Sequence, residues 1–177
     1  HIRGEGNQLK ESIEEALVIG RESGIPVNIS HIKVIGRQNE GNSRDIIRYI
    51  EENQKAGMTI TADQYPFTGG SAPLISQIPP KYLTAGKAEG LRCLAESAEL
   101  RKQAEWSIFH EAHEFESNIY SAGYEGCLIA GAYKTKEHIG KTLAQLAEEQ
   151  GKTPFDACID LLAANDGIVQ GIYFSQN

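Results

Sequence analysis

The chain has 177 residues, of which 40% are hydrophobic, so it is long enough for one domain with a core, or for a domain with a small insertion. Its formal charge is −7, with 24 acidic against 17 basic side chains, and the basic residues are dispersed along the sequence. This balance offers no strong attraction to a polyanion, so we expect no nucleic-acid partner.

The sequence also carries no signal for export or for membrane insertion. Cys93, Cys127 and Cys158 are an odd number at wide spacing without a CxxC motif, which fits a reducing compartment. The sequence has no run of about 18 apolar residues, and its first ten residues do not resemble a signal peptide. We therefore expect a cytoplasmic protein without membrane contact. Because the chain begins with His1 and its only methionine is Met58, we also expect it to be part of a longer protein.

Helices and strands alternate in the first third of the chain. Apolar side chains recur at intervals of three and four over 9–24, which predicts a helix that ends at a glycine. The β-branched run at 25–30 predicts a strand, and a second helix over 43–57 is followed at once by a second strand over 58–63. This period, close to 30 residues, is that of a βα unit, so the sequence predicts consecutive units of a parallel α/β structure.

The rhythm changes after residue 70, where no further unit of this period follows. The patterns predict helices within 79–94, 97–110, 140–150 and 154–164, and strands within 125–132 and 167–174. This stretch is therefore predicted to be a mainly helical insertion that ends in a strand.

Polar side chains stand at the predicted strand ends. His31 follows His1 by 30 positions, and Asp63 and Tyr65 follow the next strand. The carboxyl ends of parallel strands meet at one edge, and neighbouring strands lie about 5 Å apart, so two histidines there are within reach of one ion. A zinc site needs three or four ligands, however. The spacing alone therefore leaves two interpretations open, a shared metal ion or two unrelated packing histidines.

Several motifs in combination carry a family resemblance over nearly the whole chain. They are HIRGEG at the start, ISHIKVIGRQNEGNSRDI after it, TADQYPFTGGS after the second strand, and GKTLAQLAEEQGKTPFDACIDLLAANDG with IYFS near the end. Together they resemble the N-acyl-D-amino-acid deacylases (D-aminoacylases) of the amidohydrolase superfamily.

The resemblance implies a fold and a site. The fold would be part of a metal-dependent (β/α)8 barrel of the TIM type, with His1 and His31 at the ends of strands five and six as ligands of one or two zinc ions. Lys33, Tyr65 and Ser71 match the residues that hold the α-carboxylate of the substrate. Without the resemblance, Lys33 would be interpreted as a solvated loop lysine and Tyr65 as part of an ordinary strand-to-turn transition.

The resemblance also indicates what this sequence lacks. The aspartate that serves as general base in the family, and the remaining metal ligands, are expected outside this chain. Asp63 matches a different aspartate, on strand seven, and is not proposed as the base. Arg3 and Glu5 are interpreted as an ion pair that supports the first loop, and both are left out of the site.

The implied function is zinc-dependent hydrolysis of the amide of N-acyl-D-amino acids to a carboxylate and a free D-amino acid. The expected organisation is a partial barrel over 1–70, a lid-like helical insertion over 71–166, and a strand returning to the barrel over 167–177. The partners would be the small-molecule substrate and the rest of the barrel, without which the chain is expected to be inactive. Two alternatives stay open: a cyclic amidase of the hydantoinase or dihydroorotase type, and a non-catalytic module whose helical insertion is an interaction surface.

Overall fold

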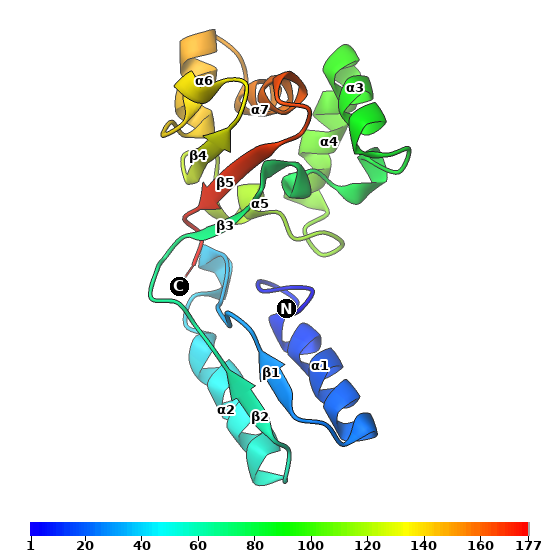
Figure 1. Cartoon of the computed structure of the whole chain (residues 1–177), viewed down its shortest axis with the longest axis vertical. Helices are drawn as coiled ribbons and strands as arrows, with labels where there is room; N and C mark the ends of the chain where they lie inside the picture. Colours follow the sequence, from blue (N-terminus) through cyan, green and yellow to red (C-terminus); the bar gives the residue numbers. More distant parts are fainter. Residues whose placement is uncertain (177) are drawn as a thin grey trace. The chain divides into compact units, whose positions relative to one another are not determined.

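Two strand–helix units make up the first part of the chain in the computed structural model, which describes residues 1–176 (Figure 1). The elements of this first unit, residues 1–68 with Gln176, are α1 (Leu9–Ser23), β1 (Val27–Ile29), the short 3-10 helix η1 (Arg37–Asn39), α2 (Ser43–Lys55) and β2 (Ile60–Ala62). Strands β1 and β2 are parallel, with Val27 opposite Ile60. The alternating α/β order predicted from the sequence is therefore confirmed.

Helix α1 packs its apolar face against β1. Ile13 and Leu17 are fully buried, as the three-and-four spacing requires, and Ile29 from β1 lies in the same core. Gly20 allows the close approach, because a Cβ there would come within 2.4 Å of Val27 Cγ2. The helix ends at Gly24, whose φ of 70° is in the left-handed region that glycine adopts without strain.

The second unit, residues 69–175, combines five helices with a three-stranded antiparallel sheet (Figure 1). Its elements are β3 (Gly70–Pro73), η2 (Leu74–Gln77), η3 (Pro80–Tyr82), α3 (Lys87–Glu96), α4 (Ala98–His110), α5 (Asn118–Ala122), β4 (Cys127–Ala132), η4 (Lys136–His138), α6 (Leu143–Gln150), α7 (Pro154–Ala164) and β5 (Val169–Tyr173). The sheet order is β3-β5-β4.

Strand β5 differs from the expectation that 167–177 returns to the barrel. Within residues 1–176 it pairs with β3 and β4 of the second unit, with Gly70 opposite Tyr173, and it does not extend the β1-β2 sheet. The alternating pattern predicts a strand but not its partner. The partner β3 begins within the TGGS stretch, whose glycines suggest a turn rather than a strand.

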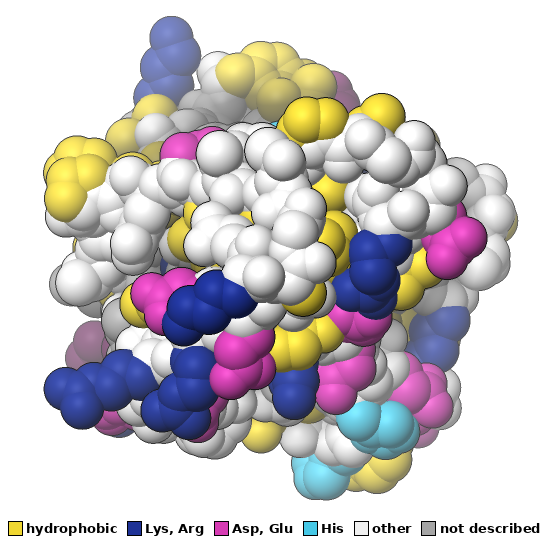
Figure 2. Space-filling model, turned by 90° about the horizontal axis from the view of Figure 1, so that it is seen from below, with side chains coloured by type: hydrophobic (Ala, Val, Ile, Leu, Met, Phe, Trp, Pro, Cys, Tyr) yellow, Lys and Arg dark blue, Asp and Glu magenta, His cyan; other side chains and the backbone are white. Residues whose placement is uncertain are grey.

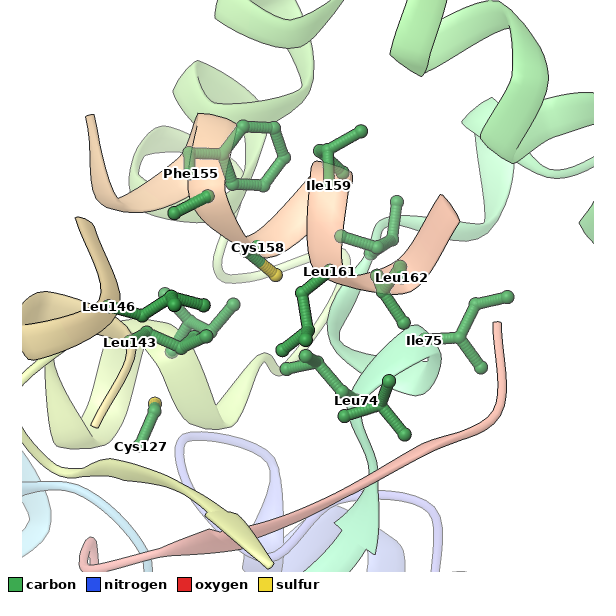
Figure 3. Close-up of a cluster of buried hydrophobic side chains, with 14 of the residues drawn as sticks. Leu74, Ile75, Cys127, Leu143, Leu146, Phe155, Cys158, Ile159, Leu161 and Leu162 are labelled. Atoms are coloured by element: carbon green, nitrogen blue, oxygen red, sulfur yellow. The ribbon is translucent and has the colours of Figure 1, made fainter. Parts of the chain in front are cut away.

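Helix α7 forms the centre of the core of the second unit. Thr153 caps its start by accepting a hydrogen bond from the backbone N–H of Asp156 (3.1 Å), and Pro154 occupies the first turn. Figure 3 shows Phe155, Ile159 and other α7 side chains among side chains from α6 and η2. The predicted helix over 154–164 is confirmed, and its apolar side chains from Phe155 to Leu162 are buried in this core.

The three cysteines differ in accessibility. Burial raises the pKa of the Cys127 thiol to about 12 and also raises the pKa of Cys158, whereas Cys93 is partly exposed. Because only the thiolate attacks a disulfide, a thiol-specific chromogenic disulfide at pH 8 is expected to react rapidly with one thiol of the folded chain and with all three after denaturation. Rapid reaction of two or more thiols in the folded chain would contradict this burial.

The chain leaves the first unit and re-enters it at one point. The backbone N–H of Gln176 donates to Thr68 O (3.3 Å), and Gln176 also forms an isolated antiparallel bridge with Ile35. Thr68 and Gln176 are the first unit's residues on either side of the second unit. The two positions at which the chain leaves and re-enters the first unit are therefore hydrogen-bonded neighbours.

The charged side chains are mixed on the surface. On the face drawn in Figure 2, Lys and Arg side chains lie among Asp and Glu side chains rather than in one basic patch. This distribution agrees with the dispersed basic residues of the sequence. Across residues 1–176, no helix combines the length and the apolar composition that a membrane span requires.

Candidate metal centre

His1 and His31, separated by 30 positions in the sequence, meet in the first unit. His1 Nδ1 lies 2.5 Å from His31 Nε2, and the two ring centroids are 4.4 Å apart. The rings are inclined by 56°, so they present an edge to one another rather than stacking. Two ring nitrogens that converge in this way can share either a proton or a metal ion.

Asp63 holds the backbone that carries His31. The backbone N–H of His31 donates to Asp63 Oδ1 (2.7 Å), and that of Ile32 donates to the Asp63 carbonyl (2.9 Å). His31 has a φ of 43°, a left-handed conformation that costs free energy for a residue with a side chain. The hydrogen bonds from His31 N–H and then from the Asn28 amide hold the pKa of the Asp63 carboxyl below its usual range. Asp63 therefore acts here as an acceptor that fixes the turn.

Substitution Asp63→Ala is expected to loosen this turn. The His31 N–H would lose a charged acceptor, so its amide hydrogen should exchange with solvent about tenfold faster. Hydrogen exchange followed by mass spectrometry over 28–35 measures this change. Asp45→Ala is the matched control, because Asp45 is an exposed residue of α2 paired with Arg48 on its own helix. Unchanged exchange in the Asp63 variant would mean that the turn does not depend on this carboxylate.

Lys33 lies against the other side of the His31 ring. Its Nζ is 3.0 Å from His31 Nδ1, and it donates to Glu5 Oε1 (2.5 Å) and to the His31 carbonyl (2.9 Å). The Lys33 side chain is only 8% exposed, and its Nζ lies 5.6 Å from the centre of the Tyr65 ring. A buried ammonium requires such acceptors, so Lys33 is not a solvated loop lysine.

Tyr65 and Ser71 fall in different units. Tyr65 lies in the first unit, where its hydroxyl accepts a hydrogen bond from Gln176 Nε2 (2.6 Å). Ser71 lies on β3 of the second unit, opposite Ile172, and its hydroxyl donates to Gly171 O (3.2 Å) and accepts from Gln170 Nε2 (2.8 Å). The first unit thus brings together four of the five predicted site residues: His1, His31, Lys33 and Tyr65.

The structure changes the interpretation of Arg3 and Glu5 in the first loop. Arg3 pairs with Glu15 (2.8 Å) and not with Glu5, whose carboxylate instead contacts Lys33 and His31. The predicted pair is wrong because each side chain reaches a partner far along the chain, and the two-residue spacing of Arg3 and Glu5 does not specify that partner. Lys33 meets the His31 ring within a turn, since β1 ends at Ile29 and His31 has a left-handed backbone.

The donor set fits part of a zinc site. Two imidazole nitrogens converge, and His31 has a carboxylate at its second nitrogen, the usual arrangement around a histidine that binds zinc. Among residues 1–176, no group of three or more His, Cys, Asp or Glu side chains is placed to hold a metal ion. The described part of the chain therefore offers two candidate ligands, and a complete zinc site would need others.

Sequence comparison gives deacylases as relatives, although no family model matches the chain. Over 74 residues the chain is 42% identical to a D-aminoacylase from Alcaligenes xylosoxydans xylosoxydans, which covers 42% of this chain and 15% of that protein. Over 77 residues it is 34% identical to an N-acyl-D-glutamate deacylase of the same organism, which covers 44% and 16%. The chain thus spans only a small part of the length of these relatives.

Solved structures match the whole chain. A crystal structure of D-aminoacylase, described as defining a novel subset of amidohydrolases, covers 100% of this chain and 27% of its own, with a TM-score of 0.64 and 26% identity. An N-acyl-D-glutamate deacylase from Bordetella bronchiseptica, complexed with zinc and a phosphonate inhibitor, has the same coverage, a TM-score of 0.67 and 24% identity, and supports the fold alone.

The comparisons agree at the level of fold and at the level of sequence. The mixed α/β fold is similar to that of part of D-aminoacylase, which is described as belonging to the amidohydrolases. Within that class, the resemblance to N-acyl-D-amino-acid deacylases that the motifs predict is confirmed in both sequence and fold.

Proposed function

We propose that this chain is an internal portion of a zinc-dependent N-acyl-D-amino-acid deacylase and carries two metal ligands and part of the substrate site. The single observation that carries the proposal is the convergence of His1 Nδ1 and His31 Nε2. The relatives support the amide chemistry, because they are named as deacylases of D-amino acids. A binuclear metal centre is named for a solved D-aminoacylase, which supports one or two metal ions.

The proposed division of labour follows from the chemistry of each side chain. Bound zinc would polarise the amide carbonyl and bring the pKa of a water close to 7. His1 and His31 would be the histidine ligands. No general base is assigned to this chain, because Asp63 accepts two hydrogen bonds that fix the His31 turn. The base and the remaining ligands are proposed to lie in the rest of a (β/α)8 barrel.

Lys33 is proposed to bind the α-carboxylate of the substrate, with Tyr65 and Ser71. An ammonium has three protons, and among residues 1–176 Lys33 Nζ has two oxygen acceptors, Glu5 Oε1 and the His31 carbonyl. When His31 Nδ1 carries its own proton and cannot accept from Lys33, the third proton is available to a substrate oxygen next to the histidine pair. A lysine held by two acceptors loses little further conformational freedom when the carboxylate binds.

The arrangement of the whole protein is part of the same proposal. The parallel β1-β2 pair, with its flanking helices, would be two units of the barrel wall, and the second unit would be the insertion. Three cysteines without a disulfide support the expected reducing, cytoplasmic compartment.

The test uses the complete protein that contains this chain. Its zinc content is measured by elemental analysis, and hydrolysis is assayed with a panel of N-acetyl-D-amino acids, their L-enantiomers and a hydantoin. We expect about one or two zinc ions per protein and release of acetate from the D-enantiomers only. Ring opening of the hydantoin without acetate release would favour a cyclic amidase. Absence of both activities in a zinc-loaded protein would leave a non-catalytic module.

A further inference from the structure

Glu5 is the residue that links the proposed metal site to the proposed carboxylate site. Its Oε1 lies 3.0 Å from His31 Nδ1 and 2.5 Å from Lys33 Nζ. The Glu5 side chain is 18% exposed, and its backbone carbonyl accepts a hydrogen bond from the Ile35 N–H (2.8 Å). The loop that follows His31 therefore holds Glu5 in place from the backbone as well.

The contacts of His31 Nδ1 allow only two states of the neutral ring. Nδ1 has both Glu5 Oε1 and Lys33 Nζ at 3.0 Å. A carboxylate only accepts hydrogen bonds and an ammonium only donates them. If Nδ1 accepts from Lys33, the ring proton sits on Nε2 and points at His1. If Nδ1 donates to Glu5, then Nε2 presents a lone pair toward His1 Nδ1.

The surrounding acceptors favour the second state. Lys33 Nζ already donates to Glu5 Oε1 and to the His31 carbonyl, so it does not require Nδ1 as an acceptor. An N–H that donates to a carboxylate forms a charge-assisted hydrogen bond, which is about twice as strong as a neutral one. Without Glu5, the His31 carbonyl and His31 Nδ1 would be the acceptors beside the Lys33 ammonium, which favours the opposite tautomer.

We propose that Glu5 is a positioning residue that keeps the ring proton of His31 on Nδ1, and so keeps the Nε2 lone pair available for a metal ion, while it also holds Lys33. The role of the lone pair in zinc binding rests on the function proposed above. The position of the ring proton on His31 does not rest on that function, because it follows from contacts within this chain.

The experiment measures the tautomer and zinc binding separately, in the complete protein. Histidine labelled with nitrogen-15 reports by NMR which ring nitrogen of His31 is protonated in the metal-free protein, and His31→Gln assigns the signal. The zinc dissociation constant is measured by competition with a chelator. Glu5→Met removes the acceptor at similar volume. Glu15→Met is the matched control, because Glu15 pairs with Arg3 outside the site.

We expect the wild type and Glu15→Met to carry the proton on Nδ1. In Glu5→Met the proton should move to Nε2, and the zinc dissociation constant should rise by about 10- to 100-fold, the usual effect of losing such a partner. Glu5→Gln keeps an oxygen acceptor for Lys33 and His31, so it should fold even if Glu5→Met does not, and should weaken zinc binding to a smaller extent.

A proton on Nε2 of His31 in the wild type would overturn the proposal. Wild-type zinc affinity in folded Glu5→Met would also overturn it. If Glu5→Met does not fold, wild-type zinc affinity in Glu5→Gln would overturn it instead. If the wild type carries the proton on Nδ1 and Glu5→Met loses it from there, but the protein binds no zinc and hydrolyses no N-acetyl-D-amino acid, then the proposed function fails and the positioning role of Glu5 stands.

Discussion

Replacement of His31 with alanine is expected to abolish tight zinc binding and D-selective deacylation in the complete protein. The substitution removes one of the two nitrogens that converge, and the remaining His1 cannot hold an ion with the same set of ligands. Loss of a residue that only hydrogen-bonds to a metal ligand already lowers metal affinity or activity by about 10- to 100-fold. Loss of a ligand itself should have a larger effect. Elemental analysis and hydrolysis of N-acetyl-D-amino acids on the same samples measure both effects.

The matched control for this variant is His113→Ala. The His113 side chain is 74% exposed and lies in the second unit, so its removal should leave zinc content and activity unchanged. If the His31 variant retains both zinc and activity, His31 is a packing histidine and the proposed metal site is wrong. If the control variant also loses zinc, the loss does not report on the histidine pair.

The second large effect is expected in the core of the second unit, at Ile159. This α7 side chain is completely buried, so Ile159→Ala leaves a cavity that the surrounding side chains in Figure 3 fill only in part. The free energy of unfolding of the second unit should fall by about 2–5 kcal/mol. This is a large share of the roughly 5–15 kcal/mol that stabilises a typical protein. Urea denaturation followed by circular dichroism measures the change.

Ile168→Ala is the control for this experiment, since it makes the same chemical change just after the same helix. Ile168 is 65% exposed, so its truncation should alter the free energy of unfolding by no more than about 0.5 kcal/mol. Equal destabilisation by the two variants would mean that the core does not have the packing described.

The local elements could be predicted from the sequence because each depends on neighbours a few positions away. The apolar intervals of α1, the cap and proline at the start of α7, and the β-branched run around β1 are all local signals. The existence and type of these elements therefore followed from pattern and propensity. The histidine pair followed from the period of the βα units, which brings strand ends together.

What the pattern could not predict depends on long-range contacts. The pairing of β5 with β3 and β4 depends on which strand edges are available to it. The alternation of apolar and polar residues along β5 would be the same for any partner strand. The left-handed backbone of His31 depends on Asp63, which lies 32 positions later. The role of Glu5 was missed because a carboxylate two positions after an arginine suggests a local ion pair. The contacts of Glu5 with Lys33 and His31 form only in the folded loops and leave no signal in the sequence.

The hydrogen bond between Gln176 N–H and Thr68 O brings together the two positions of the first unit between which the second unit is inserted. Because the chain departs and returns at neighbouring backbone positions, a short glycine-containing linker from Thr68 to Gln176 could close the gap with little loop entropy. The same property means that insertions, deletions or replacement of the whole helical unit by another domain of similar end spacing would leave the strand–helix repeat in register.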